Sequence, residues 1–190
     1  MKFSIAASVL ALAMIGAGSA SATEVLGMGT PSSEQFRAKM TSSDAFEITS
    51  SKIAETHATN AQIKDFAAMM IRDHTASTDK LVALGAINKA SIEKKMEPGK
   101  DGKFASNDLF SMSQANELNS LNSKSNADFD KTYMNDQVSG HKDAVAMLEE
   151  YAKSGDNAKL KAFAAEVLPT VKSHLEMAQK IDAELDKKTM

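Results

Sequence analysis

The sequence predicts an all-α protein built as a four-helix bundle, and two observations carry that prediction. Apolar residues recur at alternating spacings of four and three along four long stretches, which places one narrow apolar stripe on each helix. Two short turns and one long connection join these stretches. No stretch shows the alternation of apolar and polar residues that is typical of a half-buried β-strand.

The first two helices are predicted over residues 31–57 and 60–88. Thr30 and Pro31 provide a start signal for the first helix, and Thr59 with Gln62 provides a capping pattern for the second. The first stripe contains Phe36, Met40, Ser43, Glu47, Ser50, Ala54 and His57. The second stripe contains Ile63, Ala67, Met70, His74, Ser77, Leu81 and Leu84. The turn between them is short, so these two helices should be antiparallel.

A long connection follows, from about Ala90 to Asn126. Residues 97–102 (Glu-Pro-Gly-Lys-Asp-Gly) form its clearest loop, and Ser106 is the predicted cap of a short extra helix. The apolar residues of that helix are Leu109, Phe110, Met112, Leu118 and Leu121. A connection of this length can cross from one end of a bundle to the other. It therefore favours a ferritin-like bundle, with a long crossover, over a simple up-down bundle.

The last two helices are predicted from Ser125 to Ser154 and from Asp156 to about residue 187. Gly155 suits the position after a helix end, and Asp156 suits a helix cap. The third stripe contains Met134, Val138, His141, Val145, Leu148 and Ala152. The fourth contains Leu160, Ala164, Val167, Val171, His174, Ala178, Ile181 and Leu185. Pro169 lies inside the fourth helix and predicts a kink there.

Residues 1–22 have the pattern of a signal peptide. Lys2 precedes an apolar run over residues 3–15, and Ala20-Ser21-Ala22 gives a cleavage pattern that predicts a cut after Ala22. The alternative is a membrane anchor, but the apolar run is short for a bilayer. We therefore expect a flexible lead-in over residues 23–30 and a bundle domain over residues 31–187. The mature chain should be periplasmic or secreted, bacterial, and without a stable membrane anchor.

Composition excludes several kinds of site. The 190 residues suit one domain, with 43% hydrophobic and 25% charged residues. A net charge of -3 and the lack of a basic block predict no nucleic-acid partner. There is no cysteine, which excludes disulfides, thiolate metal sites, cysteine nucleophiles and a lipoprotein anchor. An envelope protein or a second copy of this chain remains as a predicted partner.

A titratable residue lies near the middle of each stripe: Glu47, His74, His141 and His174. At about 1.5 Å of rise per residue, these four should lie within about 10 Å of one another along the bundle axis. Three imidazoles and a carboxylate could bind one transition-metal ion (Zn, Cu, Ni, Mn or Fe). Asp73 is an expected outer acceptor for an imidazole, with Asp136, Asp143 and Glu176 as further candidates. The alternative is a polar layer that only sets the packing of the helices.

Several runs resemble an uncharacterised, ferritin-like family of exported bacterial proteins, known as a domain of unknown function. They are Lys64–Met70, Arg72–Thr75, Phe129–Tyr133, His141–Val145, Leu160–Ala164, Leu168–Thr170 and His174–Leu175. The resemblance covers about residues 33–182 and implies an exported four-helix bundle with no established activity. Ferritin-like di-iron proteins carry Glu three residues before His, whereas Ile71 and Val171 stand there in this chain. A di-iron centre is therefore not expected.

Three functions remain open from the sequence. The first is an exported bundle that binds a metal and acts in envelope stress tolerance or metal handling. The second is a non-catalytic interaction or structural protein, which exposed apolar residues around Phe104, Leu109 and Phe110 would support. The third is a metal-dependent redox enzyme, which a pocket touching His74 and His141 would support. No catalytic residue is assigned, and an enzyme is not the leading expectation.

Overall fold

The computed structural model describes residues 29–85 and 88–188, so the predicted signal peptide and most of the predicted lead-in lie outside the described residues. These residues form an all-helical bundle. The helices are α2 (Ser33–His57), α3 (Ala61–Ala83), α4 (Lys89–Met96), α5 (Met112–Ser123), α6 (Asn126–Ser154) and α7 (Ala158–Lys188). None of them, over the residues described, is both long and apolar enough to cross a bilayer.

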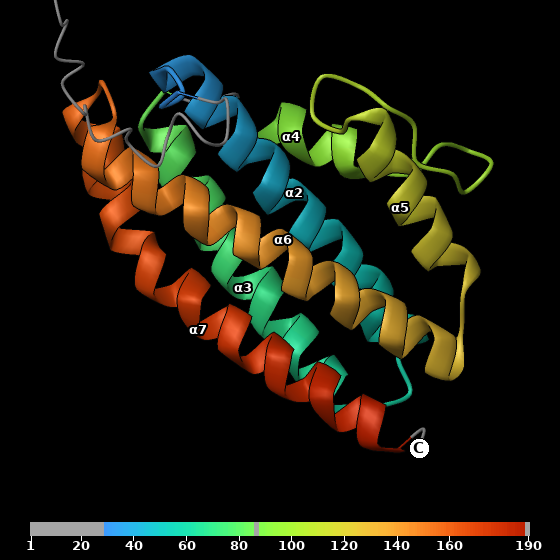
Figure 1. Ribbon diagram of the computed structural model, residues 1–190. Coiled ribbons are helices and arrows are strands. Elements are labelled where there is room, and N and C mark those ends of the chain that lie inside the picture. Colours follow the sequence, from blue (N-terminus) through green and yellow to red (C-terminus); the bar gives the residue numbers. More distant parts are fainter. Residues whose placement is uncertain (1–28, 86–87, 189–190) are drawn as a thin grey trace, which may run out of the picture.

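Two helical hairpins make the bundle. α2 packs mainly on α3, and α6 packs mainly on α7, as their short turns predict. The hairpins meet where α2 contacts α6 and α3 contacts α7. Figure 1 shows that α3 ends and α6 begins at opposite ends of the bundle, so the connection between them runs its full length. The predicted long crossover is confirmed.

The crossover contains one helix more than the sequence predicted. α3 ends at Ala83 rather than near residue 88, and α4 follows after Asn88, whose side chain caps it. α4 is short and buries only Ile92 and Met96, which is too weak a pattern to indicate a helix. α5 begins at Met112, later than predicted, because Ser111 and not Ser106 forms its capping box. Both short helices contact α2 (Figure 1).

Several helix starts differ from the prediction by a few residues. Ser32 forms the capping box of α2 with Gln35, whereas Thr30 was the predicted cap. Asn60 caps α3 in place of Thr59. Asn157 accepts hydrogen bonds from the backbone N–H groups of Lys159 and Leu160 at the start of α7, where Asp156 was expected. Asp156 instead accepts a hydrogen bond from the hydroxyl of Tyr151 at 2.7 Å.

Gly155 allows a close approach in the turn between α6 and α7. A Cβ atom at this position would lie 2.6 Å from both the ring and the carbonyl oxygen of Tyr151. Its φ is -56°, so the left-handed geometry expected after a helix end is absent. The glycine is required here by space rather than by backbone conformation.

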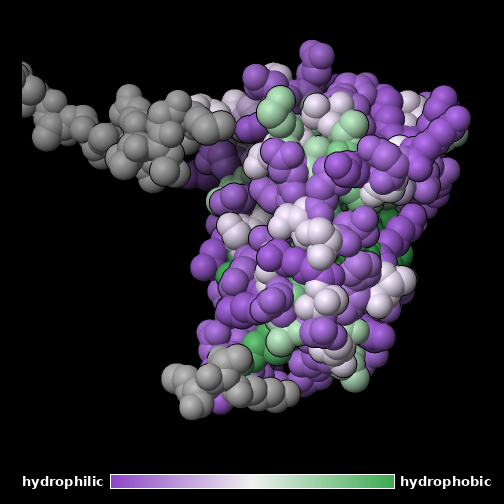
Figure 2. Space-filling view, turned by 90° about the vertical axis from the view of Figure 1, so that its right-hand side faces the viewer, coloured by the Kyte–Doolittle hydropathy of each residue, from purple (hydrophilic) through white to green (hydrophobic). Residues whose placement is uncertain are grey.

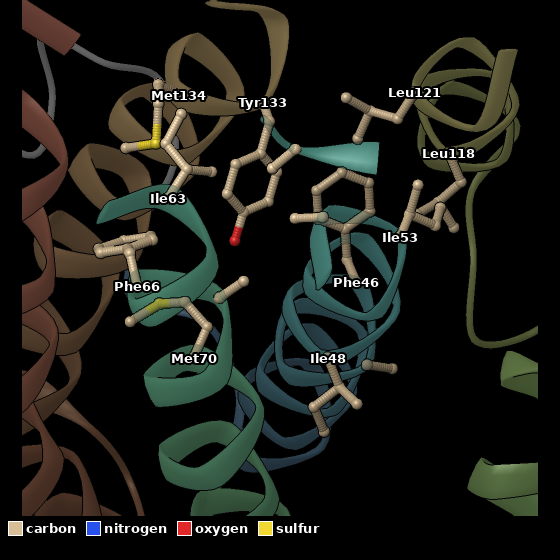
Figure 3. Close-up of a cluster of buried hydrophobic side chains, with 14 of the residues drawn as sticks. Phe46, Ile48, Ile53, Ile63, Phe66, Met70, Leu118, Leu121, Tyr133 and Met134 are labelled. Carbon is tan, nitrogen blue, oxygen red and sulfur yellow. The ribbon is translucent and has the colours of Figure 1, made fainter. Parts of the chain in front are cut away.

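The core consists of two apolar clusters at different heights. The Phe66 cluster surrounds Phe66 near the α2–α3 turn, and α5 adds Leu118 and Leu121 to it, beside Phe46 and Ile53 of α2 (Figure 3). The Phe36 cluster lies towards the α6–α7 turn, where the rings of Phe36 and Tyr151 stack with centroids 3.8 Å apart. Along α3, Met70 belongs to the first cluster and Leu81 to the second. His74 lies between these two residues in the sequence.

The crossover residues that were expected to form an exposed apolar surface are buried. Phe104, Leu109 and Phe110 are at most 8% exposed. Among the described residues, Met112 is the large hydrophobic side chain that is clearly exposed, at 72%. The face seen in Figure 2 is mostly hydrophilic, with apolar residues in small separate areas. The surface that would have supported a partner site at Phe104, Leu109 and Phe110 is therefore absent.

Asp130 of α6 holds the turn between α2 and α3. Its buried carboxylate accepts hydrogen bonds from the Thr59 N–H (3.1 Å), the Thr59 hydroxyl (2.8 Å) and the Asn60 N–H (3.1 Å). We expect Asp130→Ala to lower the free energy of unfolding by about 1.5–3 kcal/mol, because three hydrogen bonds to a buried carboxylate are lost. Urea unfolding measures this. The exposed control Asp65→Ala should change stability by less than about 0.5 kcal/mol. Equal effects of the two variants would contradict this role.

Candidate metal centre

A layer of buried polar side chains lies where the two apolar clusters meet. It includes all three histidines of the predicted site, and α2 adds Asp44 and Glu47 to it. Its other buried members are Thr41, Ser77, Thr78 and Gln137. Burial of so many polar groups is costly unless each finds a partner. The hydrogen bonds of these side chains therefore determine what the layer does.

The three histidines come together from three helices. α3 supplies His74, α6 supplies His141 and α7 supplies His174, and each is at most 6% exposed. Their ring centroids are 5.5 to 5.7 Å apart. One ring nitrogen from each residue lies within 4.8 Å of one from each of the others. The convergence predicted from their heights along the helices is thus present for these three residues.

One nitrogen of each ring has a hydrogen-bond partner outside the group. His74 Nδ1 lies 2.8 Å from Asp44 Oδ1, and His141 Nδ1 lies 2.9 Å from the carbonyl oxygen of Gln137. His174 Nε2 lies 3.1 Å from Asp73 Oδ2. These partners are acceptors, so each of these nitrogens carries the proton. The other nitrogen of each neutral ring then presents a lone pair.

The remaining ring nitrogens have no partner. His74 Nε2, His141 Nε2 and His174 Nδ1 are buried and make no hydrogen bond within the described part of the chain. A buried polar atom without a partner costs about 1–3 kcal/mol. Three such atoms in one group form a set of lone pairs that a cation could share. In metal sites, a ligating imidazole usually donates its other N–H to an acceptor, as all three rings do here.

Burial and charge set the protonation of the group. Burial acts to lower the pKa of His74, but the hydrogen bond and charge of Asp44 outweigh it and raise the pKa above 6.5. Burial lowers the pKa of His141. Burial also lowers the pKa of His174 to about 4, despite the hydrogen bond from its ring to Asp73. Two of the three imidazoles are therefore neutral at pH 7, the state that binds metals.

Glu47, the predicted fourth ligand, does not join the group. Its Oε2 accepts a hydrogen bond from Gln137 Nε2 at 2.6 Å. Its Oε1 lies 3.9 Å from His141 Nδ1, which is the nitrogen directed at the Gln137 carbonyl. Glu47 thus lies behind His141, and among the described residues the converging ligand atoms are those of the three histidines.

The outer partners were predicted only in part. Asp73 was expected as an outer acceptor, and it contacts His174 while its carboxylate is held by Arg72 at 2.8 Å. Asp44 and Gln137 were missed. Gln137 precedes His141 by one helical turn, and that spacing could have indicated it. Asp44 lies next to Ser43 and outside the predicted stripe, so the stripe did not indicate it.

Two hollows approach the polar layer from opposite sides. One, of about 220 Å³, lies between α3 and α7 and is lined by both His74 and His174. The other is a groove of about 1100 Å³ along α2 and α6, with Glu47 among its lining residues. Asp136 and Asp143, two of the candidate outer acceptors, lie along this groove rather than beside the imidazoles. Burial, with the charges of Glu117 and Glu47, raises the pKa of Asp136 to about 6.

Comparison with known families finds a family model that matches most of the chain. The family model described as Domain of unknown function (DUF4142) matches residues 18–181. No curated protein and no solved structure matches the chain. The match covers all three histidines and their partners Asp44, Asp73 and Gln137.

Proposed function

The chain belongs to the DUF4142 family, a domain of unknown function, and we propose that it binds one divalent transition-metal ion. The ligands are the neutral imidazoles of His74, His141 and His174. The observation that carries the proposal is the convergence of one ring nitrogen from each residue, because the other nitrogen of each ring is already bonded. Asp44, Asp73 and the Gln137 carbonyl orient the rings.

The same geometry argues against a polar layer that serves packing alone. Such a layer would satisfy its buried nitrogens within itself. Here one nitrogen of each ring is bonded outside the group, and the other has no partner among the described residues. Where His74 is protonated, its Nε2–H can serve at most one of the other two nitrogens, so at least one buried lone pair stays without a partner. A cation satisfies all three at once.

The donor set favours particular ions. Imidazole suits Zn²⁺, Cu²⁺, Ni²⁺ and Fe²⁺, whereas Mn²⁺ prefers carboxylate and water oxygens. With Glu47 outside the group, manganese is the least suited of the five metals considered. A bond of about 2.0–2.1 Å requires tetrahedral ligand nitrogens to be about 3.4 Å apart. Three nitrogens within 4.8 Å of one another reach that separation by each moving at most about 0.8 Å towards their centre. Because there is a single group of ligands and it contains no carboxylate, the group favours one ion over a di-iron pair.

The proposed setting is the bacterial envelope. The support is the signal-peptide pattern of residues 1–22, with its apolar run and the Ala20-Ser21-Ala22 cleavage pattern. A buried site that holds one ion suits metal handling or stress tolerance in that compartment. The proposed role in metal handling or stress tolerance rests on both the proposed metal site and the predicted export.

Zinc titration of the chelator-stripped protein tests the proposal. We expect one Zn²⁺ per chain, with an affinity that depends on pH through His74. Its Nδ1 is bonded to Asp44, so protonation occurs on Nε2, the ligand nitrogen. Its pKa is raised above 6.5, so affinity should be constant above that pKa and fall about tenfold per pH unit below it. The lowered pKa values of His141 and His174 delay further proton competition to lower pH.

Calorimetry with a competing chelator, from about pH 5 to pH 8, measures the slope of the logarithm of zinc affinity against pH. The expected result is no slope above the pKa of His74 and a slope of one proton per ion just below it. Absence of a saturable zinc site in the stripped protein would refute the proposal. A slope of three protons would contradict the assigned protonation states.

A further inference from the structure

The part of the chain that the structure describes supplies no fourth His, Asp or Glu ligand to the group of three imidazoles. Among residues 29–85 and 88–188, His74, His141 and His174 are the residues whose ligand atoms converge there. α2, the remaining long helix, directs Asp44 at the far side of His74 and Glu47 at the far side of His141. Structural zinc sites are usually closed by four protein ligands, whereas sites with three keep a position for water or another molecule. This site is of the second kind.

The pocket between α3 and α7 reaches the same group from outside. His74 and His174 line it, and each carries one of the unpartnered, buried ring nitrogens. Its walls include Ala76 on α3 and Thr170 on α7. Lys80 and Glu166 also line it, and they form an exposed ion pair at 2.7 Å between the same two helices.

The size of the pocket limits what can enter. Its volume is about 220 Å³, whereas pockets for drug-sized ligands are about 300–1,000 Å³. One water occupies about 30 Å³ of liquid. The pocket therefore suits a ligand of a few heavy atoms and excludes a peptide or a nucleotide.

The charges around the open position determine whether an anion or a cation is favoured there. Three neutral imidazoles donate lone pairs but no negative charge, so a divalent ion keeps its charge at the open position. Asp44 lies behind the ring of His74, and Asp73, which lines the pocket and contacts His174 Nε2, is paired with Arg72 at 2.8 Å. Lys80 and Glu166 neutralise each other. A small anion that can donate a lone pair is the ligand that this arrangement favours.

We propose that the ion bound by His74, His141 and His174 has an exchangeable position that takes a small monovalent anion through the pocket between α3 and α7. This inference rests on the proposed function, since it requires the metal.

The larger groove beside α2 and α6 is not the route by which the anion enters. Glu47 lines that groove beside His141, and the carboxylates of Glu117, Asp136 and Asp143 line it too. Its charge repels anions.

Azide binding to the cobalt-loaded protein tests the inference, because Co²⁺ reports its ligands through its visible spectrum. In the wild-type protein, azide should replace a bound water and shift the spectrum in a saturable way. Ala76→Phe and Thr170→Phe fill the pocket from exposed positions on its two walls. Both should bind one Co²⁺ per chain but bind azide at least about tenfold more weakly. The control Ser139→Phe, at an exposed position in the larger groove, should behave as wild type.

The outcomes separate the two proposals. If wild-type protein fails to bind cobalt, the proposed function fails. If cobalt binds and azide leaves its spectrum unchanged, the open position is refuted while the metal site stands. If both pocket variants bind azide as wild type does, or only Ser139→Phe weakens it, the route between α3 and α7 is wrong. Cobalt stoichiometry in each variant shows that its fold is intact.

Discussion

Replacing His141 with glutamine should remove nearly all of the stabilisation that a metal gives to this protein. Loss of an outer partner of a metal ligand typically weakens binding by 10–100-fold, so loss of a ligand should weaken it by at least about 100-fold. At a metal concentration of about 100 times Kd, binding stabilises the wild-type fold by about 2.7 kcal/mol. For a domain of this size, that raises Tm by about 5–10 °C. In His141→Gln the same concentration should raise Tm by about 1 °C.

The fourth histidine of the chain provides the matched control. His57 lies at the end of α2, away from the group, and its Nδ1 contacts the Lys124 carbonyl oxygen at 2.8 Å. His57→Gln can lower the Tm of the metal-free protein, but the metal-dependent rise should remain. Thermal unfolding with and without Zn²⁺ measures both. If His141→Gln keeps the full rise, or if His57→Gln loses it, the ligand assignment is wrong.

Replacing Asp44 with alanine should weaken both the metal site and the fold. Asp44 is 1% exposed and accepts the hydrogen bond from His74 Nδ1 at 2.8 Å. Without it the buried N–H has no partner, which should cost about 1–3 kcal/mol of metal-free stability. The ring also loses its fixed orientation, so we expect metal affinity to fall about 10–100-fold. Chelator competition for Zn²⁺ and urea unfolding are the measurements.

Asp44→Asn distinguishes an orienting role from a merely structural one. The amide oxygen can still accept from His74 Nδ1, so this variant should recover most of the affinity that Asp44→Ala loses. The comparison should be made at about pH 8, because removing the charge of Asp44 also lowers the pKa of His74 and reduces proton competition. Equal zinc affinity in wild type and Asp44→Ala would show that Asp44 does not orient the ligand.

The apolar stripes predicted the long helices, and their interruptions predicted the meeting of His74, His141 and His174. That success has a simple cause. The turns between paired helices are short, so distance from a turn gives height in the bundle with an error of a few residues. α4 could not be found in the same way, because eight residues with two buried side chains carry almost no periodicity.

Glu47 and Asp44 show where the stripe method fails. Residues Asp44 to Ser51 are buried without a break, because α3, α6 and α5 pack around α2. A single stripe cannot tell which partner each of these residues faces. Glu47 was therefore placed among the ligands although it bonds Gln137, and Asp44 was overlooked although it bonds His74. Assigning these contacts requires the rotation of α2 about its axis, which the sequence pattern does not give.

X-ray absorption at the zinc edge of the zinc-loaded protein tests the central claim most directly. The proposed site predicts one Zn²⁺ per chain with three imidazole nitrogens at about 2.0–2.1 Å and the outer-ring scattering that imidazoles produce. One further light ligand, from water or an anion, should complete the coordination. A coordination sphere of oxygen atoms without imidazole scattering would contradict the account, because the ion would then lie outside the group formed by His74, His141 and His174.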